Sequence, residues 1–237
     1  MDNNIVIVIS VVAVIMLLIV LLTIGTFSNR NFMEVYNKIY AKQTKTPYDV
    51  SMFINHLNEK YLSNQIAIVP INKIGGDYYN SKKKMIAVNL SGQTSLATFA
   101  VIAHEMGHAY QDNVENKLKK FNRLRVAGSL IGKLFLPILI VGIVLLFLVE
   151  NYYLVISGTL GAMVFIVLLA IIIKTKTIKI EKDASERGLN FLSEFLPDDE
   201  IKECKKLLNA ARLTYWADLI KLLLGWSGLT NKTEMFK

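Results

Sequence analysis

Cysteine and histidine are scarce in this chain, and both shortages limit the kinds of disulfide, metal and catalytic site that it can form. The 237 residues contain one cysteine, which excludes an internal disulfide framework. That residue, Cys204, lies in a lysine- and glutamate-rich stretch with no histidine near it, which predicts a packed or solvated thiol rather than a nucleophile. Two of the only three histidines lie four positions apart, and this pair is the most informative feature of the sequence.

Charged residues are absent from three long runs, 5–27, 134–149 and 152–173. The first run is long enough to cross a bilayer core of about 30 Å. The second and third are separated by Glu150 and Asn151 alone, which predicts a transmembrane hairpin. A hydrophobic content of 53% also indicates a membrane protein. Because no acidic or basic residue lies within the runs, a transport function has no support.

The first run is predicted to stay in the mature protein. Residues 1–4 before it carry no positive charge, and the run is longer than the core of a signal peptide. No small-residue cleavage site follows it. We therefore expect a retained N-terminal anchor.

Basic residues predict which side of the membrane the rest of the chain faces. The net charge is +8, but no nucleic-acid-binding motif accompanies it, so we expect no nucleic acid partner. The basic residues flank the apolar runs, which favours contact with the anionic headgroups of a lipid bilayer. By the positive-inside rule all three clusters lie on the cytoplasmic side of a plasma membrane, with the Glu150–Asn151 turn outside. The clusters comprise Arg30, Lys38, Lys42 and Lys45; Lys117, Lys119, Lys120, Arg123 and Arg125; and Lys174, Lys176 and Lys179.

The apolar runs divide the chain into four predicted segments. Residues 1–29 form a transmembrane anchor, and residues 30–125 form a cytoplasmic segment that holds the paired histidines. Residues 126–174 form the transmembrane hairpin, and residues 175–237 form a helical segment. Within the last segment, residues 207–229 are apolar but interrupted by charges, which favours a helix at the membrane interface over a fourth span.

Residues 104–108 read HEMGH and predict a metal-binding helix. On a helix, positions i and i+4 project from one face, so His104 and His108 can bind one ion. Zinc suits two imidazoles and a carboxylate, and it lowers the pKa of a bound water to about 7. Glu105 would then accept the proton of that water and pass it to a leaving amine. The nearly uncharged residues 94–103 argue against a chance surface pairing.

A helix and two strands are predicted between the first span and the metal-binding helix. Thr46 and the proline after it favour a helix start. Residues 65–69 and 85–90 are predicted strands, and residues 81–84 form a turn. The expected product is a small antiparallel sheet. Its edge could pair with an extended peptide and lay the scissile bond across the metal.

A catalytic zinc usually has three protein ligands, and the third is expected to be a carboxylate. The remaining histidine, His56, is poorly placed for the role. Glu181 is the best candidate, because it follows the third run on the same membrane face as the paired histidines; Asp183 and Glu186 are the alternatives. Arg187 is a candidate catalytic residue that could steady the anionic transition state or the carboxylates, with an ordinary surface arginine as the competing interpretation.

Several segments resemble, in the same order, the YugP-like family of bacterial membrane zinc metallopeptidases. They are residues 77–80, before the last predicted strand, residues 103–112, around the metal-binding motif, and residues 181–187, around the third ligand. The chain departs from the family pattern at two positions. Tyr78 stands where the family usually has histidine, so that position is given no catalytic role, and Lys182 replaces an aromatic residue, which would alter the packing behind the third ligand.

The resemblance implies that His104, His108 and Glu181 bind zinc and that Glu105 is the general base of a peptidase. We predict a mainly α membrane protein, with transmembrane helices and a zincin-like metallopeptidase domain built from an HExxH helix and a small antiparallel sheet. The expected function is a membrane-anchored zinc endopeptidase that hydrolyses peptide or protein substrates at the cytoplasmic face. The alternative is a catalytically silent, zinc-stabilised membrane scaffold or adaptor. Glu105 argues against it, because a structural zinc needs no base.

Overall fold

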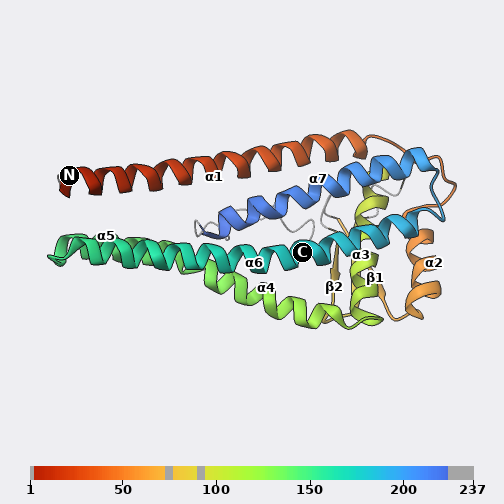
Figure 1. The fold of residues 1–237 in the computed structure, drawn as a ribbon. Coiled ribbons are helices and arrows are strands. Elements are labelled where there is room, and N and C mark those ends of the chain that lie inside the picture. Colours follow the sequence, from red (N-terminus) through yellow and green to blue (C-terminus); the bar gives the residue numbers. More distant parts are fainter. Residues whose placement is uncertain (1–2, 73–76, 90–93, 224–237) are drawn as a thin grey trace.

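Long helices dominate the computed structural model, which describes residues 3–72, 77–89 and 94–223 (Figure 1). The predicted mainly α class is confirmed. Figure 1 shows α5 and the first part of α6 extending to one side, while α2, α3 and the sheet gather at the opposite end. The elements are α1 (Asn3–Tyr40), α2 (Val50–Leu62), β1 (Ala67–Ile71), β2 (Tyr78–Asn80), β3 (Met85–Asn89), α3 (Leu96–Asn113), α4 (Lys117–Lys133), α5 (Phe135–Leu148), α6 (Tyr152–Leu192) and α7 (Asp198–Leu223).

Two helical stretches among the described residues are long and apolar enough to cross a membrane, Asn122–Leu148 and Tyr152–Leu192. Length and composition alone would also fit the core helix of a soluble protein. Only 17% of the apolar window of each stretch is buried, however, and large side chains such as Phe147 and Leu154 are exposed. The predicted span at 5–27 lies in α1. The structure describes the backbone there but only a few of the side chains.

The helix α6 runs without a break from the hairpin turn to Leu192. The predicted boundary at residue 174 therefore falls within one continuous helix. Glu181 lies eight residues beyond the end of the third apolar run, about 12 Å along the helix axis. The chain thus returns from the hairpin to the globular end on a single rigid element. The helix α7 contains residues 207–223 of the helix predicted at 207–229. Residues 224–229 lie outside the described residues.

The sheet is mixed, so the predicted antiparallel arrangement is wrong for one of its two pairings. The strand order is β1-β3-β2, with β1 parallel and β2 antiparallel to β3. The sequence prediction missed the short strand β2, which lies between the other two in the chain and allows β1 and β3 to run in the same direction. The strand β1 also extends past Pro70, which a sheet edge tolerates because no ladder hydrogen bond is lost there.

The helix α2 begins three residues later than Thr46-Pro47 predicts. Its N-cap is Asp49, whose Oδ1 accepts a hydrogen bond from the Met52 amide at 2.8 Å. An aspartate that caps the helix with its own side chain is the better start signal. The spacing of Val50, Phe53, Ile54, Leu57 and Tyr61 predicts one apolar face on this helix; the first four are fully buried and Tyr61 is half-buried.

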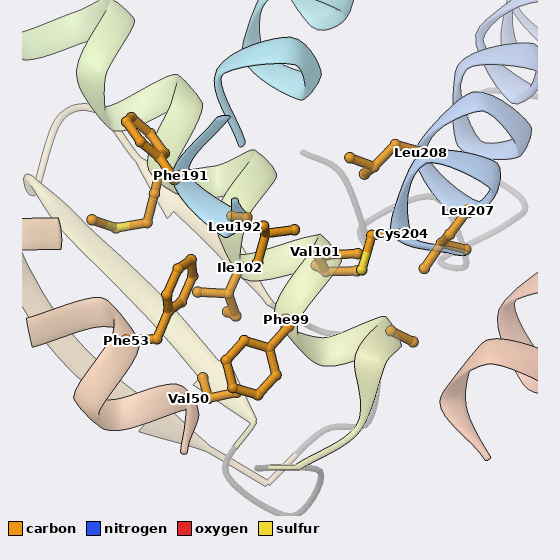
Figure 2. Close-up of a cluster of buried hydrophobic side chains, with 14 of the residues drawn as sticks. Val50, Phe53, Phe99, Val101, Ile102, Phe191, Leu192, Cys204, Leu207 and Leu208 are labelled. Carbon is orange, nitrogen blue, oxygen red and sulfur yellow. The ribbon is translucent and has the colours of Figure 1, made fainter. Parts of the chain in front are cut away.

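One hydrophobic cluster joins α1, α2, α3, the sheet, α6 and α7. Figure 2 shows Phe53 of α2 facing Phe99 and Ile102 of α3, with Leu192 of α6 beside them. The ring centroids of Phe53 and Phe99 lie 5.5 Å apart. On the α7 side, Cys204 is fully buried and burial raises the pKa of its thiol to about 12. Of the two predicted alternatives, a packed or a solvated thiol, the structure shows the packed one.

The helices α3 and α6 cross with their backbones in contact. A Cβ atom on Gly107 would overlap the carbonyl oxygen of Ala184, and one on Gly188 would lie 2.7 Å from the carbonyl oxygen of Ala103. A small residue next to His108 predicts room for a strand or a substrate against the helix, but α6 fills the space beside Gly107. Glycine is needed at both positions because a backbone atom cannot move aside as a flexible side chain can.

We predict that Gly188→Ala destabilises the protein by about 1–3 kcal/mol, because the added methyl group forces α3 and α6 apart. Gly161→Ala is the matched control, since Gly161 lies on the same helix and nothing is within 4 Å of the added Cβ. Thermal unfolding of the two purified variants in detergent measures the difference. Equal transition temperatures for both variants would contradict the close crossing.

Candidate metal centre

Four side chains from α3 and α6 meet in one buried cluster. The helix α3 supplies His104, Glu105 and His108, and α6 supplies Glu181. The Nε2 atoms of His104 and His108 lie 3.3 Å and 3.0 Å from Glu181 Oε2. All four side chains are buried. The structure therefore brings together the three predicted ligands and the predicted base, although Glu181 lies 73 residues beyond His108.

The donor atoms fit a zinc ion in number, type and spacing. One ligand atom from each of His104, His108 and Glu181 lies within 4.8 Å of the other two. In a tetrahedral zinc site with bonds of about 2.0–2.1 Å, neighbouring ligand atoms are about 3.3 Å apart. Two imidazoles and one carboxylate are also the protein ligands of many catalytic zinc sites, which keep the fourth position open.

The outer nitrogens of both histidines have acceptors that fix the rings. His104 Nδ1 lies 3.0 Å from Ser185 Oγ, and the Ser185 hydroxyl donates to the Glu181 carbonyl oxygen, which leaves its oxygen to accept. His108 Nδ1 lies 3.0 Å from Gln111 Oε1. Both rings therefore carry a proton on Nδ1 and direct Nε2 at the cluster. The sequence prediction gave Ser185 and Gln111 no role, although their spacings of four and three residues from ligands were the available signal.

Glu105 is held by one oxygen only. Its Oε2 accepts the Tyr79 backbone N–H at 2.8 Å, while the buried Oε1 makes no hydrogen bond to any residue that the structure describes. Burial raises the pKa of Glu105 to about 7. Tyr79 is itself anchored, because its hydroxyl donates to Asp112 at 2.8 Å, and Lys84 donates to the same oxygen at 2.6 Å. The edge strand β2 thus fixes the orientation of the carboxylate.

Charge in the cluster favours an ionised Glu181. Burial alone would raise its pKa, but the two imidazoles hold it well below the ordinary value. Burial lowers the pKa of His104. Burial lowers the pKa of His108 as well, but Glu181, Glu105 and Gln111 together outweigh it and raise that pKa to about 9. A metal ion therefore competes with a proton for His108 Nε2.

The remaining predicted residues lie around this cluster rather than in it. Arg187 pairs with Asp183 and Glu115, and among the described residues it contacts none of the three ligands. Asp183 accepts a hydrogen bond from Gln111, and Glu186 is exposed beside Lys182. His56 lies on α2, where its Nε2 is 3.7 Å from Glu194. A direct catalytic role for Arg187 thus stays a prediction, which no contact between Arg187 and the described cluster residues supports.

We predict that Glu181→Ala abolishes stoichiometric zinc binding, because it removes one of three ligands and leaves two imidazoles alone. Glu186→Ala, which removes an exposed carboxylate five residues further along α6, should keep the native zinc content. Elemental analysis after gel filtration of the detergent-solubilised proteins compares the two. Native zinc content in Glu181→Ala would show that the ligand assignment is wrong.

Comparison with known protein families gives one match and two negative results. Residues 10–227 match the family described as "Putative neutral zinc metallopeptidase". No curated protein and no solved structure matches the chain, so the predicted zincin-like architecture remains a prediction. The family match covers most of the sequence and includes all four residues of the cluster, and it confirms the resemblance drawn from the sequence segments. The chain belongs to this neutral zinc metallopeptidase family.

Proposed function

We propose that this protein is a membrane-anchored zinc endopeptidase in which Glu105 is the general base. The observation that supports this best is the position of Glu105 beside the three candidate ligands. One oxygen of Glu105 is fixed by the Tyr79 amide, and the other has no hydrogen-bond partner among the described residues. A zinc site with only a structural role would leave this buried carboxylate without a purpose.

The chain's own residues divide the work of peptide hydrolysis. His104, His108 and Glu181 would hold zinc, which when bound supplies a Lewis acid and an activated water. Glu105 Oε1 accepts the proton of the attacking water and later delivers it to the leaving amine nitrogen. The amide of Tyr79 keeps Oε2 engaged, so the carboxylate does not rotate away between these two transfers.

The exposed apolar helices support a position in the membrane. The surfaces of α5 and the first part of α6 present large hydrophobic side chains that a bilayer would cover. The basic clusters that flank the apolar runs favour a cytoplasmic location for the globular end. Peptides and loosely folded segments, including those of membrane proteins, are then the proposed substrates.

We predict that Glu105→Gln retains zinc but lowers peptide hydrolysis by about 10²- to 10⁴-fold, because the amide cannot accept the proton. Glu186→Gln, at an exposed position, is the control and should cleave at the native rate. Cleavage of a casein-like substrate and zinc content are measured on the same preparations. Undiminished cleavage by Glu105→Gln would refute the mechanism, and zinc-loaded native protein without activity on any peptide library would favour the scaffold alternative.

Cysteine labelling tests the proposed orientation, because the native thiol should be silent. Cys204 is fully buried and its pKa is raised to about 12, so a maleimide should not modify it near pH 7.5. In intact cells, a membrane-impermeant maleimide should label Glu150→Cys, in the exposed turn between α5 and α6. Lys82→Cys, in the exposed turn before β3, should react only after the membrane is opened. The reverse pattern would place the globular end outside.

A further inference from the structure

A fully buried amide fixes the outer nitrogen of His108. Gln111 Nε2 donates to the Ile180 carbonyl oxygen at 3.0 Å and to Asp183 Oδ2 at 2.7 Å. Both amide hydrogens are used in this way, so Gln111 Oε1 is the atom that faces His108 Nδ1 at 3.0 Å. The orientation of the His108 ring therefore depends on Gln111, and the orientation of Gln111 depends on Asp183.

Arg187 in turn holds Asp183 in place. Its Nε donates to Asp183 Oδ2 at 3.0 Å, and its Nη2 donates to Glu115 Oε1 at 2.7 Å. The guanidinium group also lies over the Tyr110 ring, 4.9 Å from its centroid. These contacts use the planar fork of arginine, which a lysine ammonium cannot reproduce. Arg187 is therefore fixed on three sides, and Asp183 receives donors from both Gln111 and Arg187.

This chain of contacts links Arg187 to the metal centre without direct contact. Among the described residues, Arg187 contacts none of the candidate ligands and does not contact Glu105. Its influence on the centre must pass through Asp183 and Gln111 to His108. The same chain extends outward to Glu115, which also pairs with Lys117 at 2.8 Å at the start of α4.

We propose that Arg187 and Asp183 are positioning residues that act through Gln111 to direct His108 Nε2 at the ion, and so set the affinity of the centre for zinc. This rests on the zinc centre of the proposed function and gives Arg187 a role other than transition-state stabilisation. Loss of an outer partner of a ligand histidine typically weakens metal binding by about 10- to 100-fold.

The test is the zinc affinity of the purified full-length protein in detergent, measured by competition with a chromophoric chelator. Arg187→Met and Asp183→Ala should each weaken zinc binding by about 10- to 100-fold. Glu186→Gln is the matched control, because it breaks the Lys182–Glu186 pair on the same helix, an exposed pair with the same i,i+4 spacing. Its zinc affinity should equal that of the native protein.

A double variant separates positioning from a general structural effect. If Arg187 acts through Gln111, Arg187→Met should add no further loss of affinity in a Gln111→Leu background, whereas independent structural damage would add. Additive losses, or native affinity in Arg187→Met, overturn the proposal. If Arg187→Met fails to fold, Asp183→Ala takes its place, and native affinity in that variant overturns the proposal equally. A native chain that binds no zinc refutes the proposed function and this inference with it, whereas a zinc-binding native chain with unaffected variants refutes this inference alone.

Discussion

The candidate centre depends on the backbone contact between α3 and α6. Two candidate ligands and the candidate base lie on α3, and the third candidate ligand and Ser185 lie on α6, so the separation of the helices sets the distances from Glu181 to both imidazoles. Gly107 and Gly188 allow the helices to approach until carbonyl oxygens meet α-carbons. A wider crossing would separate Glu181 from the imidazoles. The glycine inside the HEMGH motif therefore serves helix packing, a role independent of metal chemistry.

Such a crossing also explains how two carboxylates and two imidazoles can share a buried space. Removing ionised groups from water costs free energy unless each finds a partner of opposite charge or a hydrogen bond. The contacts of Glu181 with both imidazoles offset part of that cost. A divalent cation between the same atoms would neutralise the carboxylate and satisfy both Nε2 lone pairs. The amide of Tyr79 holds Oε2 of Glu105, and Oε1 would remain for the proposed proton transfer.

Features that follow from local residue spacing could be predicted from the sequence. Features that depend on contacts between distant segments could not. The i,i+4 histidines, the apolar face of α2 and the long apolar runs are periodic patterns that the sequence displays directly. Glu181 could be found because the predicted membrane topology returns the chain to the side of the paired histidines. Gln111 and Ser185 lie three and four residues from candidate ligands, but this spacing alone does not distinguish them from ordinary polar residues. Their roles arise only when α6 lies against α3. The strand β2 was missed for a different reason, because three residues are too few to show the alternation that indicates a strand.

The continuity of α6 gives the proposed membrane hairpin a structural purpose. Residues 30–125 contain Glu105 and the two candidate ligand histidines, His104 and His108. They cannot complete the cluster alone, because Glu181 and Ser185 lie on a helix that begins at Tyr152. The predicted span at 152–173 and the candidate ligand Glu181 thus lie on one continuous helix. Any shift of α6 along its axis would carry Glu181 past the paired imidazoles, and the backbone contact at Gly107 and Gly188 resists that shift. The proposed hairpin separates the two halves of the candidate site in sequence, so the site needs a contact that fixes the returning helix. In this chain the small residues of α3 and α6 meet that requirement.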